Sequence, residues 1–445
     1  MKQYPKYKDS GIQWIGRIPS SWKITKTKYI AKLYTGNSLD DAQKEKYTTH
    51  PLEMDVSDIP YIATKDITSD CDCVSYYNGV AIPNNEQGFK KAPEGSFLLC
   101  IEGGSAGKKH AFLEREVCFV NKLCCFDTQL NSRFHYYFIQ SNPFTSHFQQ
   151  LIQGLIGGVS VSELNNMEIV VPPVAEQEAI ARYLDEKTAK IDESVYLLEQ
   201  QKADLQEFRK ALISQTVTRG LNPNAKLKDS GIQWMGGVPA EWRIAPLKTL
   251  LSLLTDGTHQ TPTYLDKGIP FVSIKDMSSG KLNFSDAKYI SQEEHELLSK
   301  HAPVAKGDIL FSRIGTLGVF IKVDTDEVFD IFVSLGLMKI IPDAINTDFL
   351  VYYLSSDTIR KYIDIVKAGE GTSAAKFNLT DVSKTPILLP SQAEQQAIVD
   401  YLDTKTAKIN ETIARIDTQI ADLKAYRTAL ITEAVTGKMD VRLEN

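Results

Sequence analysis

Two long stretches of the chain carry an apolar residue at every seventh position and contain no proline. A narrow apolar stripe with this period is typical of a coiled coil of two helices. At 1.5 Å per residue, a helix of about 40 residues is about 60 Å long, which is more than a small domain requires. The predicted helix-pairing residues are Leu184, Ile191, Leu198, Leu205 and Leu212 in the first stretch, and Leu402, Ile409, Ile416, Leu423 and Leu430 in the second. Val195, Phe208, Ile413, Ile420 and Tyr426 are predicted to complete the stripe.

The two stretches belong to a longer repeat. The heptapeptide KDSGIQW at residues 8–14 returns at residues 228–234, and AEQEAIARYLDEKTAKIDE at 175–193 is echoed at 393–411. This recurrence indicates one architectural unit written twice in tandem. The sequence between these anchors differs between the copies, so a repeated frame surrounds a variable body. We predict bodies at residues 1–174 and 221–392, a helix at 175–220, and a second helix with a C-terminal tail at 393–445.

Each stripe must be buried against a partner, and the other stripe of the same chain is the most economical one. Antiparallel pairing then predicts one body at each end of a helical rod, with a pseudo-twofold axis through its middle. The tail after the second helix resembles the segment after the first, which indicates a nearly closed ring of repeats. The alternative is that each helix packs on its own body as an ordinary surface helix.

The bodies combine strand and helix patterns, which predicts a mixed α/β structure. Apolar runs that end in Lys-Asp occur in both copies, and each copy also has a strand that breaks into a glycine-rich loop. Predicted strands lie at 59–67, 168–173, 269–277 and 386–390, glycine loops follow strands that begin near 95 and 307, and short helical patterns lie at 135–141 and 351–363.

Composition favours an ordinary globular protein. The hydrophobic content of 42% and the charged content of 24% are typical of that class. No window is apolar enough to cross a membrane, and the N-terminus lacks the apolar core of a signal peptide. We therefore expect a cytoplasmic location.

The cysteines all lie in the first body, although the second body is built on the same frame. A disulfide framework essential to the fold would occur in both copies, so free thiols are expected. The alternative of a metal site is disfavoured, because neither close pair has zinc-ligand spacing. The six residues are Cys71, Cys73, Cys100, Cys118, Cys124 and Cys125.

The net charge of −6 argues against a uniformly basic nucleic-acid binder, but its location matters. The stretch 176–218 has 9 acidic and 6 basic residues, and 394–436 has 7 and 5, so the helices supply five of the six excess negative charges. The bodies are therefore near neutral and can present local basic surfaces.

The glycine loops could carry chemistry. The sequence GGSAGKK at 103–109 does not fit a P-loop, because its first glycine would be Glu102 and no Ser or Thr follows Lys108. The corresponding RIGTLG has no lysine at all. A tight turn remains one interpretation, and contact with a nucleic acid backbone or base edge is the other.

Candidate nucleic-acid contacts lie on these loops, on the Lys-Asp turns and on the polar loop TDGTHQTP at 255–262. They are Lys65, Gly103, Gly104, Ser105, Lys108 and Lys109 in the first body, and Thr258, His259, Gln260, Thr261, Lys275, Ser312, Arg313 and Thr316 in the second. No dinucleotide fingerprint, zinc-protease motif, nucleophile elbow or metal-binding carboxylate cluster occurs. The sequence thus predicts a protein that recognises a nucleic acid and has no catalytic and no metal-binding residues.

The order of these elements resembles the specificity subunit of Type I restriction-modification enzymes, the HsdS family. The paired KDSGIQW openings, the Lys-Asp strands, the GDILFSRIGTLG loop and the Pro-AEQ junctions into heptad helices carry the resemblance over essentially the whole chain.

The resemblance implies an α+β fold with two mixed α/β target recognition domains, joined by two long helices in an antiparallel coiled coil. It implies that each domain reads half of a split DNA sequence, that the helices set the spacer, and that two methyltransferase subunits dock on this chain. S-adenosylmethionine, ATP and Mg²⁺ would belong to the methyltransferase and restriction subunits, and none to this chain. Two rival hypotheses are a coiled-coil adaptor that binds other proteins and an enzyme that holds a nucleotide on its glycine loops.

Overall fold

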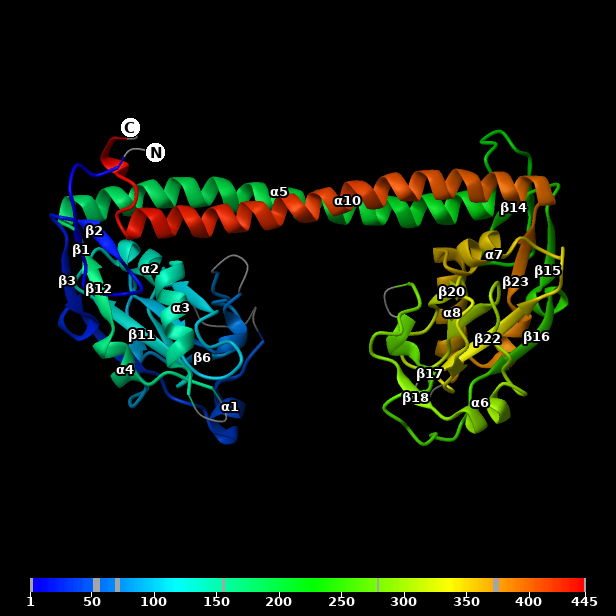
Figure 1. The fold of residues 1–445 in the computed structure, drawn as a ribbon, viewed down its shortest axis with the longest axis horizontal. Helices are drawn as coiled ribbons and strands as arrows, with labels where there is room; N and C mark the ends of the chain where they lie inside the picture. The colour runs from blue at the N-terminus through cyan, green and yellow to red at the C-terminus, as the bar shows by residue number, and fades with distance from the viewer. Residues whose placement is uncertain are drawn as a thin grey trace. The chain divides into compact units, whose positions relative to one another are not determined.

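The computed structural model describes residues 3–50, 57–68, 73–153, 157–277, 280–370 and 376–443. Contacts group the chain into two compact units, one formed by Met1–Glu199 with Asp417–Asn445 and the other by Gln200–Ile416. The first unit therefore contains both ends of the chain. Helices α5 (Val174–Arg219) and α10 (Gln392–Val435) each contribute to both units and lie side by side within each (Figure 1).

Most elements occur in the same order in both units, although one helix and one strand of the first and one helix of the second have no counterpart. The first contains β1 (Tyr7–Asp9), β2 (Arg17–Pro19), β3 (Lys23–Lys26), η1 (Thr27–Tyr29), β4 (Ala31–Thr35), α1 (Asp41–Tyr47), β5 (Ile59–Ile62), η3 (Thr64–Asp66), β6 (Ala81–Ile82), β7 (Lys91–Ala92), β8 (Phe97–Cys100), β9 (His110–Phe112), β10 (Val117–Phe119), β11 (Leu123–Thr128), α2 (Ser132–Gln140), α3 (Asn142–Leu151), α4 (Val161–Asn166), β12 (Glu168–Val171) and the 3-10 turn η6 (Val441–Leu443). The second contains β13 (Leu227–Asp229), β14 (Gly237–Pro239), β15 (Arg243–Pro246), η4 (Leu247–Leu250), β16 (Leu251–Asp256), β17 (Ile269–Val272), η5 (Ile274–Met277), β18 (Lys288–Ile290), α6 (Gln292–Leu298), β19 (Ile309–Ser312), β20 (Phe320–Lys322), β21 (Asp330–Ile331), β22 (Leu335–Ile340), α7 (Thr347–Leu354), α8 (Asp357–Glu370), α9 (Leu379–Lys384) and β23 (Pro386–Leu389).

A four-stranded antiparallel sheet is common to both units. Its order is β4-β11-β8-β9 in the first and β16-β22-β19-β20 in the second. One sheet face packs against helices and the other against a second sheet, β6-β5-β10-β7 or β18-β17-β21. In the second unit Phe311 needs Gly336 opposite it, because a Cβ there would lie 2.2 Å from the ring.

Helices α5 and α10 pair in opposite directions. In the first unit Arg427 pairs with Asp192 at 2.9 Å and Lys424 with Glu199 at 3.4 Å, so the numbering rises along one helix as it falls along the other. In the second unit Arg209 donates to Asn410 at 2.6 Å. The predicted antiparallel pairing is confirmed.

The heptad positions form the inner side of this pair. Leu184, Ile191, Leu402, Ile409, Ile416 and Leu430 are buried, and Leu198, Leu205, Leu212 and Leu423 are half-buried. Two residues that we placed in the stripe lie elsewhere, since Phe208 is 57% and Tyr426 49% exposed. Their spacing from the heptad positions turns them to the edge of the seam, where both side chains stay exposed.

Each helix also packs on a body. The alternative, in which each helix is a surface helix of its own body, is therefore correct in part, because the helices pair with each other as well. Trp22 Nε1 donates to Glu176 Oε2 at 2.9 Å, and Trp242 Nε1 donates to Glu394 Oε2 at 3.0 Å. Tyr137 donates to Asp185 at 2.7 Å, as Tyr352 does to Asp403 at 2.6 Å. These matched contacts explain the repeated anchors, which hold each body on a helix.

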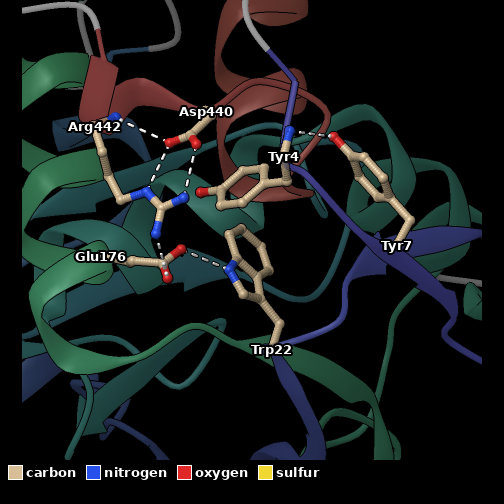
Figure 2. A network of polar contacts seen from close by, with 6 residues as sticks. All are labelled: Tyr4, Tyr7, Trp22, Glu176, Asp440 and Arg442. Atoms are coloured by element: carbon tan, nitrogen blue, oxygen red, sulfur yellow. Dashed lines mark hydrogen bonds and ion pairs between the residues drawn. The ribbon is translucent and has the colours of Figure 1, made fainter.

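The C-terminal tail completes the first unit. Met439, Asp440 and Val441 are at most 5% exposed. Arg442 binds Asp440 through two nitrogens at 2.7 and 2.8 Å, lies over the ring of Tyr4, and pairs with Glu176 at 3.4 Å (Figure 2). The two ends of the chain are therefore tied to the start of α5.

Two expectations about the bodies are corrected. Cys73 is disulfide-bonded rather than free, whereas Cys100, Cys118, Cys124 and Cys125 are free and buried; Cys71 lies outside the described residues. The repeat argument failed for Cys73 because it lies in the variable body, where the second copy gives no constraint. The helical pattern at 351–363 is broken at Ser355 and Ser356 into α7 and α8, since the Ser356 hydroxyl bonds to the Tyr353 carbonyl.

No helix in the described ranges is long and apolar enough to span a membrane.

Candidate nucleic-acid interface

The glycine loop of the first unit follows β8 and is tied to the Lys-Asp turn. Gly103 and Gly107 have positive φ, which lets the chain turn sharply after the strand. Lys109 Nζ donates to the Thr64 carbonyl at 2.8 Å, and the neighbouring Lys65 is exposed. The loop and the turn thus present cationic side chains from two segments that are far apart in the sequence.

The rest of this loop is largely exposed to solvent. Lys108 and Gly104 are exposed, and Lys108 Nζ lies 3.4 Å from the Gly104 carbonyl. Ser105 is half-buried, and its carbonyl accepts from the Lys108 and Lys109 amides at 3.0 and 3.3 Å. The carbonyls of Gly104 and Ser105 are therefore occupied within the loop, and Lys108 is its exposed cationic side chain.

In the second unit an ion pair joins the polar loop to the glycine loop. Arg313 Nη1 pairs with Asp256 Oδ2, and both side chains are nearly buried, at 10% and 11% exposed. Arg313 Nε has no hydrogen-bond partner among the described residues. Burial lowers the pKa of the guanidinium, which nevertheless stays charged at neutral pH.

Histidines surround Asp256. His259 Nε2 lies 3.0 Å from Asp256 Oδ2, and His301 Nε2 lies 3.7 Å from Oδ1 and 2.9 Å from the Thr255 hydroxyl. A hollow of about 290 Å³ opens beside them, lined by Gly257, Thr258, His259, Gln260, Leu297, Leu298, His301, Ala302, Asp330 and Ile331. On its wall Asp330 binds His295 at 2.6 Å, and burial raises the pKa of the Asp330 carboxyl.

Most predicted residues of the second unit gather at this place. Ile274 next to Lys275 donates its amide to the Ser334 hydroxyl, and the Ser334 carbonyl accepts the Arg313 amide at 3.0 Å. The structure places His259, Gln260, Thr261, Lys275 and Thr316 at the surface and Thr258 half-buried. Ser312 is fully buried, and its hydroxyl accepts from the Val319 amide at 2.9 Å, so it holds the loop in shape.

Sequence reasoning missed Asp256 and His301. Gly36 and Gly257 occupy matching places, because the amide after each donates to the strand carbonyl of Phe119 or Ile331. Thr35 directly precedes Gly36, and Asp256 stands at the same place in the sheet before Gly257. An acidic residue in place of this threonine was the available signal.

The partner of Asp256 also differs between the units. The Arg313 carbonyl accepts from Phe377 as the Ile101 carbonyl accepts from Val159, so apolar Ile101 stands where the second unit has arginine. The two units therefore offer different chemistry at the same place in one fold.

These side chains are donors and acceptors of the kinds that read base edges and phosphates. Within the described ranges no group of three or more His, Cys, Asp or Glu could hold a metal ion.

Comparison with known proteins agrees with this arrangement. A family model described as the Type I restriction modification DNA specificity domain matches residues 19–203 and again 239–421. The Type I restriction enzyme EcoKI specificity subunit of Escherichia coli strain K12 is 24% identical over 454 residues, covering 94% of this chain and 91% of its own length. The EcoBI specificity subunit of Escherichia coli is 25% identical over 402 residues, with coverage of 84% and 81%.

The fold is shared with a solved structure. A chain from a study of complex assembly and conformational transition of the type I R-M system is similar at a TM-score of 0.70 and 16% identity, covering 95% of this chain and 99% of that one. The two family matches cover well over half of the sequence. The chain therefore belongs to the family of Type I restriction modification DNA specificity domains, and its role is to specify DNA sequence without catalysing a reaction.

Proposed function

We propose that this chain reads an asymmetric, bipartite DNA target, with one half-site for each unit. The observation that carries the proposal is the repeated frame with unlike loops. The same anchors hold both bodies on helices, while Arg313 with Asp256 in one unit is replaced by Ile101 in the other. Two readers on one frame with different contact residues would recognise different base sequences.

The long helices would set the spacer between the half-sites. Their paired heptad residues fix the register of one helix on the other, and a fixed register gives a fixed length. The number of base pairs between the half-sites would then be set by the length of the helices, and these base pairs would not be contacted.

The outer face of the helices would recruit two methyltransferase subunits. Leu197 and Tyr426 are 59% and 49% exposed there and line a hollow of about 600 Å³ with Leu198 and Leu423. Apolar side chains in this number on a helical surface favour a partner protein. Restriction and translocase subunits would join through the methyltransferase.

Cofactors would belong to those partners. S-adenosylmethionine would be held by the methyltransferase, and ATP with Mg²⁺ by the restriction subunits, in a cytoplasmic complex on the host DNA. This chain would supply only the recognition of the DNA sequence.

The test is to co-express the chain with its methyltransferase and sequence methylated adenines in the host genome. We expect one split motif with two different half-sites and a constant spacer, and DNA binding that weakens as salt rises. A single continuous motif would contradict the bipartite reading. Binding of ATP or S-adenosylmethionine to the purified chain alone would contradict the division of roles.

A further inference from the structure

The C-terminal end of a long helix is covered in the first unit and is more exposed in the second. In the first unit the tail after α10 buries Leu430 and Ile431, which are 2% and 1% exposed. The matching residues at the end of α5, Leu212 and Ile213, are only half-buried. The second unit therefore lacks cover at a place where the first has it.

A groove lies at this uncovered place. It has a volume of about 590 Å³ and is lined by Leu212, Gln215, Thr216, Arg219, Gly220, Leu221, Asn222, Pro223, Ala225, Leu227 and Tyr401. Leu221 and Leu227 are 41% and 50% exposed. Exposed leucines beside a hollow are typical of a protein-binding surface.

The first unit shows what fills the matching space. Tyr183, the counterpart of Tyr401, donates to Met439 Sδ at 4.0 Å, and Met439 is fully buried. Arg442 of the same tail reaches Glu176, the counterpart of Glu394 (Figure 2). The space is thus filled by a turn that runs into the 3-10 helix η6, with an apolar, an acidic and a basic side chain in the order Met439, Asp440, Arg442.

The charges of the groove suit a similar segment. Among the described residues no basic side chain pairs with Glu394, which receives Trp242 Nε1 and would lie 2.9 Å from a Cβ at Gly220. Glu394 therefore lacks the cation that Arg442 supplies to Glu176. Arg219 on the groove wall favours an acidic neighbour.

We propose that this groove binds a short, turn-forming segment of the methyltransferase subunit, with an apolar side chain against Tyr401 and a basic side chain on Glu394. The proposal rests on the proposed function, because it assigns the groove to the partner named there. The tail of a second copy is a poorer occupant, since Met439 and Val441 are already buried in its own first unit. The two methyltransferase subunits would then dock on surfaces that differ.

The first test compares two exposed apolar residues of the second unit. Leu221→Asp places a charge in the groove, and the matched control Ile365→Asp alters α8, where Ile365 is 52% exposed. We expect methyltransferase binding, measured by titration calorimetry on the full chain, to weaken about tenfold in the first variant and not in the control. Equal affinities would overturn the groove while leaving the proposed function intact. An unaltered chain that binds no methyltransferase would instead overturn the proposed function.

A second test needs no variant of the chain. A synthetic peptide of residues 437–443 should compete with the methyltransferase for the unaltered chain, and an Arg442→Glu version of the peptide should compete about tenfold less well. Absence of competition would overturn the proposal. So would self-association of the chain that the peptide and Leu221→Asp both abolish, because the occupant would then be a second copy.

Discussion

Among single residues, His135 in α2 makes the first unit sensitive to acid. Its ring is buried, Nδ1 lies 3.0 Å from the Thr128 hydroxyl, and burial lowers its pKa to about 3. An unfolded histidine has a pKa of about 6.5. As pH falls below that value the unfolded chain takes up the proton first, so the folded unit loses stability until pH reaches about 3.

The repeat offers a natural replacement, because Leu350 stands at the matching place and is fully buried. We expect His135→Leu to reduce the stability lost between pH 7 and pH 5 by about 2 kcal/mol. The measurement is urea unfolding at both pH values. The variant His50→Leu changes an exposed ring and serves as the control. An unchanged pH dependence in His135→Leu would show that another group dominates.

The pair of Arg313 and Asp256 should matter for recognition by the second unit alone. We expect Arg313→Ile, which copies Ile101, to weaken discrimination at one position of one half-site by roughly 10–100-fold. The variant removes the ion pair that holds Asp256 beside the exposed His259, and a good side-chain contact to a base is worth about 1–3 kcal/mol. The measurement is competition binding with single-base variants of both half-sites. Arg243→Ile on β15 changes an exposed arginine and should leave both half-sites as they are. A loss at both half-sites would assign Arg313 to folding instead.

At the scale of elements, the paired helices should behave as a spacer of adjustable length. Removing residues 201–207 from α5 together with 412–418 from α10 takes one heptad from each and keeps the seam in register. Seven residues are about 10.5 Å, which corresponds to about three base pairs at roughly 34 Å for each ten. We expect a spacer shorter by about three base pairs with both half-sites unchanged.

The check is binding to DNA duplexes that differ only in spacer length. Removing 201–207 alone should weaken binding at every spacer, because the seam then pairs residues that do not match. Altered half-site bases with the original spacer would refute the role of the helices.

Elements also mark where sequence reasoning succeeds. Helix α5 was expected at 175–220 and runs from Val174 to Arg219, because a heptad stripe is a local signal repeated many times. The strands at Ile59 and Ile269 are predicted from apolar runs that end in Lys-Asp in both copies, but each is shorter than predicted and turns into a 3-10 helix. Asp256 and His301 were missed, because a local pattern in the sequence does not show which residues the fold brings into contact. The burial of Ser312 was likewise not predicted, because its sequence neighbourhood was interpreted as an exposed loop.

Considered as a whole molecule, the chain closes on itself in the first unit, where its two ends meet α5. Ending the chain after Lys438 would remove Met439 and Val441, which are 0% and 5% exposed, and the ion pair of Arg442 with Glu176. Loss of one buried methionine side chain costs about 2–5 kcal/mol. We expect calorimetry to show a first unit that unfolds at a lower temperature while the second keeps its transition, and methylation mapping to show relaxed recognition of one half-site. Arg442→Gln keeps the apolar side chains and should cost about 1 kcal/mol. If truncation lowered both transitions equally, the tail would support the molecule through the helices rather than complete one unit.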